Sequence, residues 1–262
     1  MLVVGVVGVA LLWWFATGSL LFLGHLPRTV YRWAFVASTA LLVVALAGLA
    51  WVAPMATPAG AVLSFLFGFL AWSWQEVGFY SGIVTGPRTV HCRPGCRGWR
   101  HFGHALQACL YHEVGIVLSA GLVALATSGG ANRVGLWTFL LMWGLHESAR
   151  INVFLGVRNV SASFLPPHLD HIRSFLSLRS RPGAAMAISL LASTGVAAAL
   201  IVAALAAPSG TGTATGLALL ATMGVVGVLE HLMLILPLPE TLLWGWAVPR
   251  GSATASAATQ GD

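Results

Sequence analysis

The chain has 262 residues, of which 58% are hydrophobic and 8% are charged, and its mean hydropathy is +0.86. Soluble domains carry roughly 25% charged residues, so the composition excludes a soluble protein and indicates an integral membrane protein. The formal charge of +6 comes entirely from arginine, and the positions of these arginines relative to the apolar runs explain it without nucleic acid as a partner.

Seven apolar runs are long enough to cross a bilayer as helices, since a transmembrane helix needs about 20 apolar residues. They cover residues 3–24, 33–53, 60–84, 104–127, 134–155, 184–206 and 214–236. The first run has no basic segment before it and is too long for a signal peptide, so we expect it to be a membrane helix. We predict an all-α polytopic membrane protein: one helical domain over residues 1–250 with about seven transmembrane helices, then a disordered polar tail over residues 251–262.

Arginine content alternates between the connections. Twelve of the thirteen arginines lie in the first, third and fifth connections or after the last run, and Arg133 alone lies in the others. Cytoplasmic loops carry an excess of arginine and lysine. The pattern therefore predicts an outside N-terminus and a cytoplasmic C-terminus.

The fifth connection is too long for a simple connector, at about 30 residues. In it, Pro166 and Pro167 place His168 on a rigid turn. The following stretch, residues 169–178, is amphipathic and predicts a helix on the membrane surface. Its apolar face comprises Leu169, Ile172, Phe175 and Leu176.

Four of the seven acidic residues lie inside the predicted spans, where charged side chains are costly. Together with neighbouring histidines, the set is Glu76, His112, Glu113, His146, Glu147, Glu230 and His231. At 1.5 Å rise per residue, all would lie roughly 9–12 Å below the cytoplasmic surface. We therefore expect one polar layer built by four helices. His104 lies on the same helical face as His112 and could begin a proton or water path to this layer.

Several roles remain open for such a layer. Carboxylates with imidazoles could hold one or two iron, manganese or zinc ions, relay protons, or ligate the magnesium of a pigment through one histidine. They could also form a buried network that fixes helix register. Arg150 is one turn from His146 and could neutralise its neighbours. Asn152 and Arg158 could cap the end of the fifth run or position His168 over the layer.

Cys92 and Cys96 flank a turn in the arginine-rich third connection, with His91 beside them. The spacing could bind zinc, but zinc sites usually combine two ligand pairs. A second pair is missing from this pattern, so we do not predict a zinc site there.

Several motifs resemble the PuhE-type photosynthetic complex assembly proteins of anoxygenic phototrophic bacteria. They are Trp74-Gln75-Glu76, Tyr111-His112-Glu113, Ile151-Asn152-Val153-Phe154-Leu155-Gly156-Val157-Arg158-Asn159, Phe164-Leu165-Pro166-Pro167-His168-Leu169, Leu229-Glu230-His231 and Leu236-Pro237-Leu238-Pro239. The long run from Ile151 to Asn159 is the most specific of them. The chain departs from the family's pattern at Gln75 and Tyr111, where that pattern has histidine.

The resemblance implies a multi-pass protein of the bacterial inner (cytoplasmic or intracytoplasmic) membrane. It also implies a role in assembling the photosynthetic reaction centre and core antenna, with pigment (bacteriochlorophyll) or nascent reaction-centre and light-harvesting subunits as partners. The alternative is a membrane metalloenzyme, such as an oxidase or hydroxylase, acting on a pigment or quinone precursor. Its predicted metal ligands are Glu76, His112, Glu113, His168, Glu230 and His231. Further functional candidates are Asn152, Arg158, His104, His146 and Glu147.

Overall fold

The computed structural model describes residues 2–159, 165–181, 183–236 and 241–247. The predicted tail and the Pro237-Leu238-Pro239 motif lie outside these ranges. Seven helices of at least 22 residues are present. They are α1 (Leu2–Leu23), α2 (Arg28–Val52), α3 (Pro58–Tyr80), α4 (Gly98–Ala126), α5 (Val134–Leu155), α6 (Ala184–Ala206) and α7 (Gly212–Met233). The described ranges also contain a 3-10 helix, η2 (Pro167–Phe175), and a short α8 (Thr241–Trp244).

Six of these helices are long and apolar enough to cross a membrane: α1, α2, α3, α4, α6 and α7. Helix α5 is as long, but its second half carries His146, Glu147 and Arg150, which lower its hydropathy. The predicted all-α class is confirmed, because the described ranges contain no strand and only one isolated bridge, between Val157 and Leu178.

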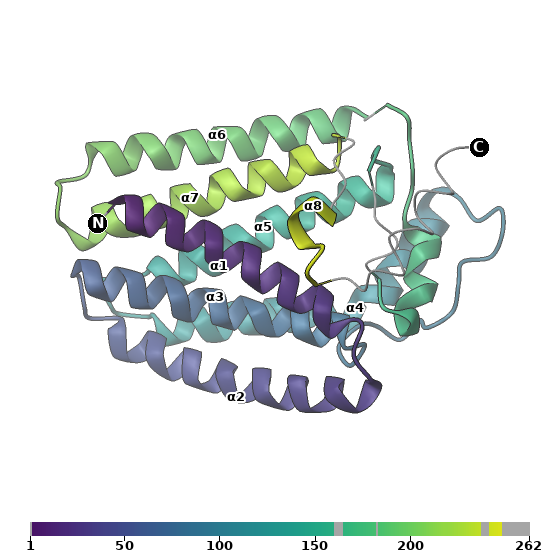
Figure 1. The fold of residues 1–262 in the computed structure, drawn as a ribbon, viewed down its shortest axis with the longest axis horizontal. Helices are drawn as coiled ribbons and strands as arrows, with labels where there is room; N and C mark the ends of the chain where they lie inside the picture. Colours follow the sequence, from purple (N-terminus) through teal and green to yellow (C-terminus); the bar gives the residue numbers. More distant parts are fainter. Residues whose placement is uncertain (1, 160–164, 182, 237–240, 248–262) are drawn as a thin grey trace.

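Helix α3 is the centre of the bundle, where it packs against α2, α5 and α7 (Figure 1). One apolar core joins α2, α3, α4 and α5. Its buried members include Leu49, Trp72, Ile116 and Phe139. A second core joins α1, α3 and α7. Its buried members include Val9, Phe65, Phe69 and Met223. These two cores hold α3 in a fixed position between its neighbours.

The backbones of α3 and α5 come into close contact at two glycines. A Cβ atom on Gly68 would overlap the backbone of Gly135, so neither position has room for a side chain. The Gly135 amide also donates a hydrogen bond to Ser64 Oγ, at 2.8 Å. Because this contact fixes α5 on α3, it also fixes the ionisable side chains further along both helices.

Two helix ends differ from the predicted spans. Helix α3 ends at Tyr80 rather than at residue 84, because Gly82 takes a φ of +75° that does not continue a helix. Helix α4 begins at Gly98 rather than at residue 104. Its first turn contains Arg100 and His101, and a hydropathy pattern does not detect a polar turn of helix.

The amphipathic stretch of the fifth connection forms most of η2, and three of the four residues of its predicted apolar face are buried. The fourth, Leu176, follows η2 and is half-buried. Leu169, Ile172 and Phe175 pack with Ala108 of α4. This apolar face therefore covers protein, and the placement of the helix on the membrane surface stays a prediction. The stretch packs on protein beside the start of α4, at the right-hand end of the bundle in Figure 1.

Candidate functional site

The candidate site is a set of ionisable side chains on α3, α4, α5 and α7, which we call the polar layer. It comprises Glu76, His112, Glu113, His146, Glu147, Arg150, Glu230 and His231. Direct contacts link five of these residues across α3, α4 and α5: Glu76, His146, Arg150, Glu113 and Glu147. Glu230 and His231 have separate partners, on α1 and α5.

The first pair joins α3 to α5. Glu76 Oε1 lies 3.2 Å from His146 Nδ1, and both side chains are mostly buried. The His146 ring also meets Trp72 edge-on, with ring centroids 5.3 Å apart. A hydrogen bond to a charged partner is roughly twice as strong as a neutral one, so this pair holds the two helices in register.

Arg150 makes the second set of contacts and joins α5 to α4. Its guanidinium forms an ion pair with Glu113 and contacts the ring of His146. It also lies 3.7 Å from Glu147, one turn away on the same helix. The expectation that Arg150 neutralises its neighbours therefore agrees with its contacts.

The formal charges of the polar layer do not balance. Four carboxylates (Glu76, Glu113, Glu147 and Glu230) face one guanidinium, which leaves −3 when the histidines are neutral. Charge of this size is expensive inside a bilayer. Protons on the carboxylates and histidines, or a bound cation, must therefore offset it.

His112 of α4 is the unusual member of the layer. Its side chain is fully buried, and neither ring nitrogen has a hydrogen-bond partner among the described residues. The ring lies beside His146 and Phe79, with centroid separations of 5.6 and 5.0 Å. An unpaired buried polar group costs about 1–3 kcal/mol. A group retained at that cost is a candidate for binding something or for passing a proton.

The adjacent residues of α7 point to different neighbours. Glu230 accepts a 2.6 Å hydrogen bond from Trp13 of α1. His231 contacts Ser148 Oγ of α5 at 2.9 Å through Nε2 and the Gly227 carbonyl at 2.8 Å through Nδ1. Sequence reasoning missed Trp13, because a tryptophan inside an apolar run does not indicate which polar group it reaches.

The specific run at the end of α5 connects helices. Asn152 is buried and donates to Ser189 Oγ of α6 and to the Ser148 carbonyl, both at 2.8 Å. Asn159 donates through its side chain to the Met233 carbonyl at 3.1 Å, at the end of α7. Arg158 is exposed. These contacts tie α5 to α6 and α7 rather than placing His168 over the layer.

His168 lines a pocket of about 360 Å³ between η2 and the turn that joins α1 to α2. Its Nε2 lies 3.0 Å from the Tyr80 carbonyl, and its ring packs on Tyr31 at a centroid distance of 4.9 Å. Burial lowers the pKa of His168, and the hydrogen bond to Tyr80 opposes this. Arg28 lines the same pocket. His168 therefore faces this pocket and not the polar layer.

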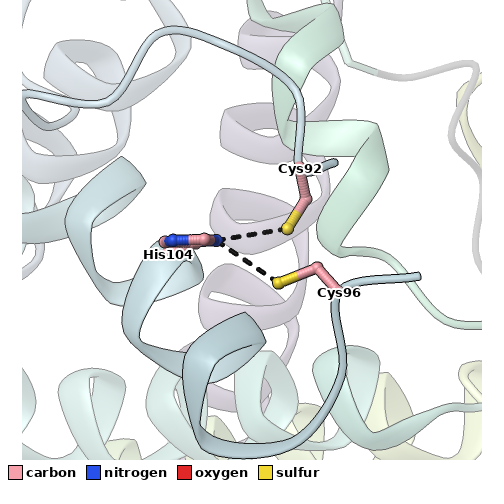
Figure 2. A group of neighbouring side chains, drawn as sticks. All are labelled: Cys92, Cys96 and His104. Atoms are coloured by element: carbon pink, nitrogen blue, oxygen red, sulfur yellow. Dashed lines mark hydrogen bonds between the residues drawn. The ribbon is translucent and has the colours of Figure 1, made fainter. Parts of the chain in front are cut away.

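A second group of ligating side chains lies outside the polar layer. Cys92, Cys96 and His104 bring two sulfurs and one ring nitrogen within 4.8 Å of one another (Figure 2). Among the described residues this is the one set of at least three acidic, histidine or cysteine side chains that converges closely enough to hold a metal. His91 instead pairs with Asp170 of η2 at 3.3 Å. The signal that could have found the set is a histidine in the second turn of the helix that follows the cysteine pair.

Comparison with known proteins gives a family but no activity. The model of the family described as "Protein of unknown function (DUF3623)" matches residues 1–255. The chain is also 31% identical over 241 residues to the "Uncharacterized 30.4 kDa protein in puhA 5'region" of Rhodobacter capsulatus, which covers 90% of this chain and 87% of that protein. No solved structure matches the chain.

Proposed function

We propose that this chain, which belongs to the DUF3623 family, is a non-enzymatic membrane factor for assembly of the photosynthetic reaction centre and core antenna. The observation that carries the proposal is the similarity to a Rhodobacter capsulatus protein named for its place beside puhA, a photosynthesis-related gene region. The resemblance to PuhE-type assembly proteins points the same way.

The polar layer supports a binding role better than a catalytic one. Its carboxylates already have partners: Glu76 has His146, Glu113 has Arg150, and Glu230 has Trp13. Paired groups hold helices in register and leave few free to do chemistry. His112 is the exception, and we assign to it the contact with pigment or with a nascent subunit.

A membrane metalloenzyme is the second candidate, with Glu76, His112, Glu113, His168, Glu230 and His231 as ligands. The unpaired ring of His112 and the unbalanced charge of the layer favour it. Against it, no three of the layer's described carboxylates and histidines lie within metal-ligand reach of one another. We therefore place it second.

For topology we propose seven spans, with α5 as the seventh. Helix α5 packs against α3, α4, α6 and α7, and its polar residues find partners on these helices rather than in lipid alone. An odd number of spans also keeps twelve arginines on one side, which we assign to the cytoplasm. A reporter enzyme that is active only outside the cytoplasm should be inactive when fused after Arg250, and activity there would contradict this topology.

Deletion of the gene in its phototrophic host distinguishes between the two candidate functions. An assembly factor predicts less reaction-centre and core-antenna complex with chemically normal pigments. A metalloenzyme predicts an accumulated pigment or quinone precursor. Wild-type levels of both complexes and pigments would exclude the two proposals together.

A further inference from the structure

The cysteine pair before α4 is arranged around one histidine nitrogen. Cys92 and Cys96 flank a turn that contains Gly95 at a φ of +78° and closes with a hydrogen bond from the Cys96 amide to the Arg93 carbonyl, at 3.1 Å. The turn leads back to α4, so His104 in the second turn of that helix points between the two sulfurs (Figure 2). His104 Nδ1 lies 3.4 Å from Cys92 Sγ and 3.5 Å from Cys96 Sγ.

These distances match those in a tetrahedral zinc site. With zinc–sulfur bonds of about 2.3 Å and zinc–nitrogen bonds of about 2.0–2.1 Å, tetrahedral angles place sulfur and nitrogen about 3.6 Å apart. Hydrogen bonding explains the arrangement less well, since one ring nitrogen has either one lone pair or one N–H. It can therefore satisfy one sulfur but not both, whereas a metal ion between the three atoms satisfies all of them.

We propose that Cys92, Cys96 and His104 bind one Zn²⁺ ion. Two thiolates and a neutral imidazole balance the charge of the ion, and this soft set in tetrahedral geometry suits zinc. The separation of the cysteines by three residues is also within the usual range for zinc ligands. The fourth position belongs to water, because His101 is outside the convergent set.

His101 supports the ligands rather than joining them. Its Nδ1 lies 3.2 Å from Cys92 Sγ, within reach of a hydrogen bond to the thiolate. Its ring is held by Phe154 and Phe175, with centroid distances of 5.3 and 5.4 Å. Hydrogen bonds from such outer groups orient metal ligands and tune their affinity.

The surrounding protein fixes the cysteine turn in place. The Cys92 amide donates to Ser174 Oγ of η2 at 3.0 Å. The Cys92 side chain packs against the apolar cluster that contains the buried Phe175. His91 reaches Asp170 of the same element. The ion would therefore lock the arginine-rich connection onto both α4 and η2.

Elemental analysis of the full chain in mild detergent tests the site. The protein should be made in a phototrophic host and purified through an affinity tag without histidines and without chelators. We expect about one zinc ion per chain in the wild type, since a built site of this kind binds zinc tightly at neutral pH. Cys92→Ser, Cys96→Ser and His104→Ala should each lose it.

Two matched control variants and one variant of the supporting His101 show whether the loss of zinc is specific to the three ligands. Cys109→Ser removes the third cysteine of the chain, and His91→Ala removes the histidine paired with Asp170. Both variants should keep their zinc. His101→Phe keeps an aromatic ring between Phe154 and Phe175 but loses the hydrogen bond, and should bind zinc about 10–100-fold more weakly in competition with a chelator.

Cobalt titration of the wild type keeps the test valid if the ligand variants do not fold. Binding of Co²⁺ by two thiolates should produce a sulfur-to-metal absorption band that zinc abolishes. A wild type that retains no zinc and gives no such band, or a Cys92–Cys96 disulfide in protein alkylated at lysis, would overturn the proposal. So would equal loss of zinc from the controls. The result does not depend on the proposed assembly function.

Discussion

Glu76 Oε1 and His146 Nδ1 face each other across the α3–α5 interface at 3.2 Å. The two helices reach this position because Gly68 and Gly135 bring their backbones together earlier along the bundle. We expect the pair to stabilise the fold through mutual interaction. A double-mutant cycle of Glu76→Gln and His146→Gln, measured by unfolding in mixed detergent, should show a coupling of about 0.5–3 kcal/mol.

The matched control for this cycle pairs Glu76→Gln with Asn152→Ala, because Asn152 bonds to Ser189 of α6 instead. Those two changes should add within about 0.5 kcal/mol. Equal coupling in both cycles would mean that the Glu76–His146 contact has no special role.

The same change at two fully buried histidines should destabilise the protein to different extents. His231 has partners at both ring nitrogens, so His231→Leu leaves Ser148 unpaired and should cost about 1–3 kcal/mol. His112 has none, so His112→Leu should cost less than about 1 kcal/mol, because nothing is left unpaired. Unfolding of the two variants under the same detergent conditions makes the comparison. An equal cost would show that His112 is structural.

Glycine contacts give a prediction independent of charge. Gly68→Ala places a methyl group against the Gly135 backbone and should destabilise the protein by about 1–3 kcal/mol through overpacking. Gly144→Ala on α5 meets no atom within 4 Å and should leave the stability unchanged or slightly raised. Thermal unfolding measures both. A tolerated Gly68→Ala would contradict the close approach of α3 and α5.

The stability around η2 should fall in mild acid. Burial, with Arg28 nearby, lowers the pKa of His168 in the folded protein, whereas the unfolded value is about 6.5. The unfolded state then binds more protons between these two values, so the contribution of His168 is present above about pH 6.5 and is lost as the pH falls towards the folded pKa. Hydrogen exchange of the η2 amides, corrected for intrinsic rates, should show faster opening at low pH in the wild type. His168→Gln should show a smaller change, and an identical change would contradict this cause.

The helices were predictable from the sequence, because an apolar run long enough to cross the hydrocarbon core indicates a helix whatever packs beside it. The ends of α3 and α4 were not predictable. The first turn of α4 has the composition of a loop, and α3 ends at Tyr80 because Gly82 takes a positive φ that does not continue a helix. The apolar face of η2 was also evident from the sequence. The spacing of its hydrophobic residues does not show whether protein or lipid covers that face.

The candidate site was predictable only where contacts are local. Arg150 and His146 lie one turn apart, so their contact follows from helix geometry. The partner of His146 on α3 and the partner of Glu230 on α1 depend on helix order around the bundle, which composition does not determine. His104 was assigned by its helical face to a path towards His112, yet the preceding turn brings two cysteines to it.

The assembly role is tested most directly in the phototrophic host. Strains that carry the wild type, a deletion or His112→Leu should be compared by near-infrared absorption of membranes and by chromatography of extracted pigments. We predict a several-fold loss of reaction-centre and core-antenna absorption in the deletion and in His112→Leu, with full-length protein still present in the variant and unchanged pigment chemistry. Accumulation of a pigment or quinone precursor, or wild-type levels of both complexes in the deletion strain, would contradict the assembly role.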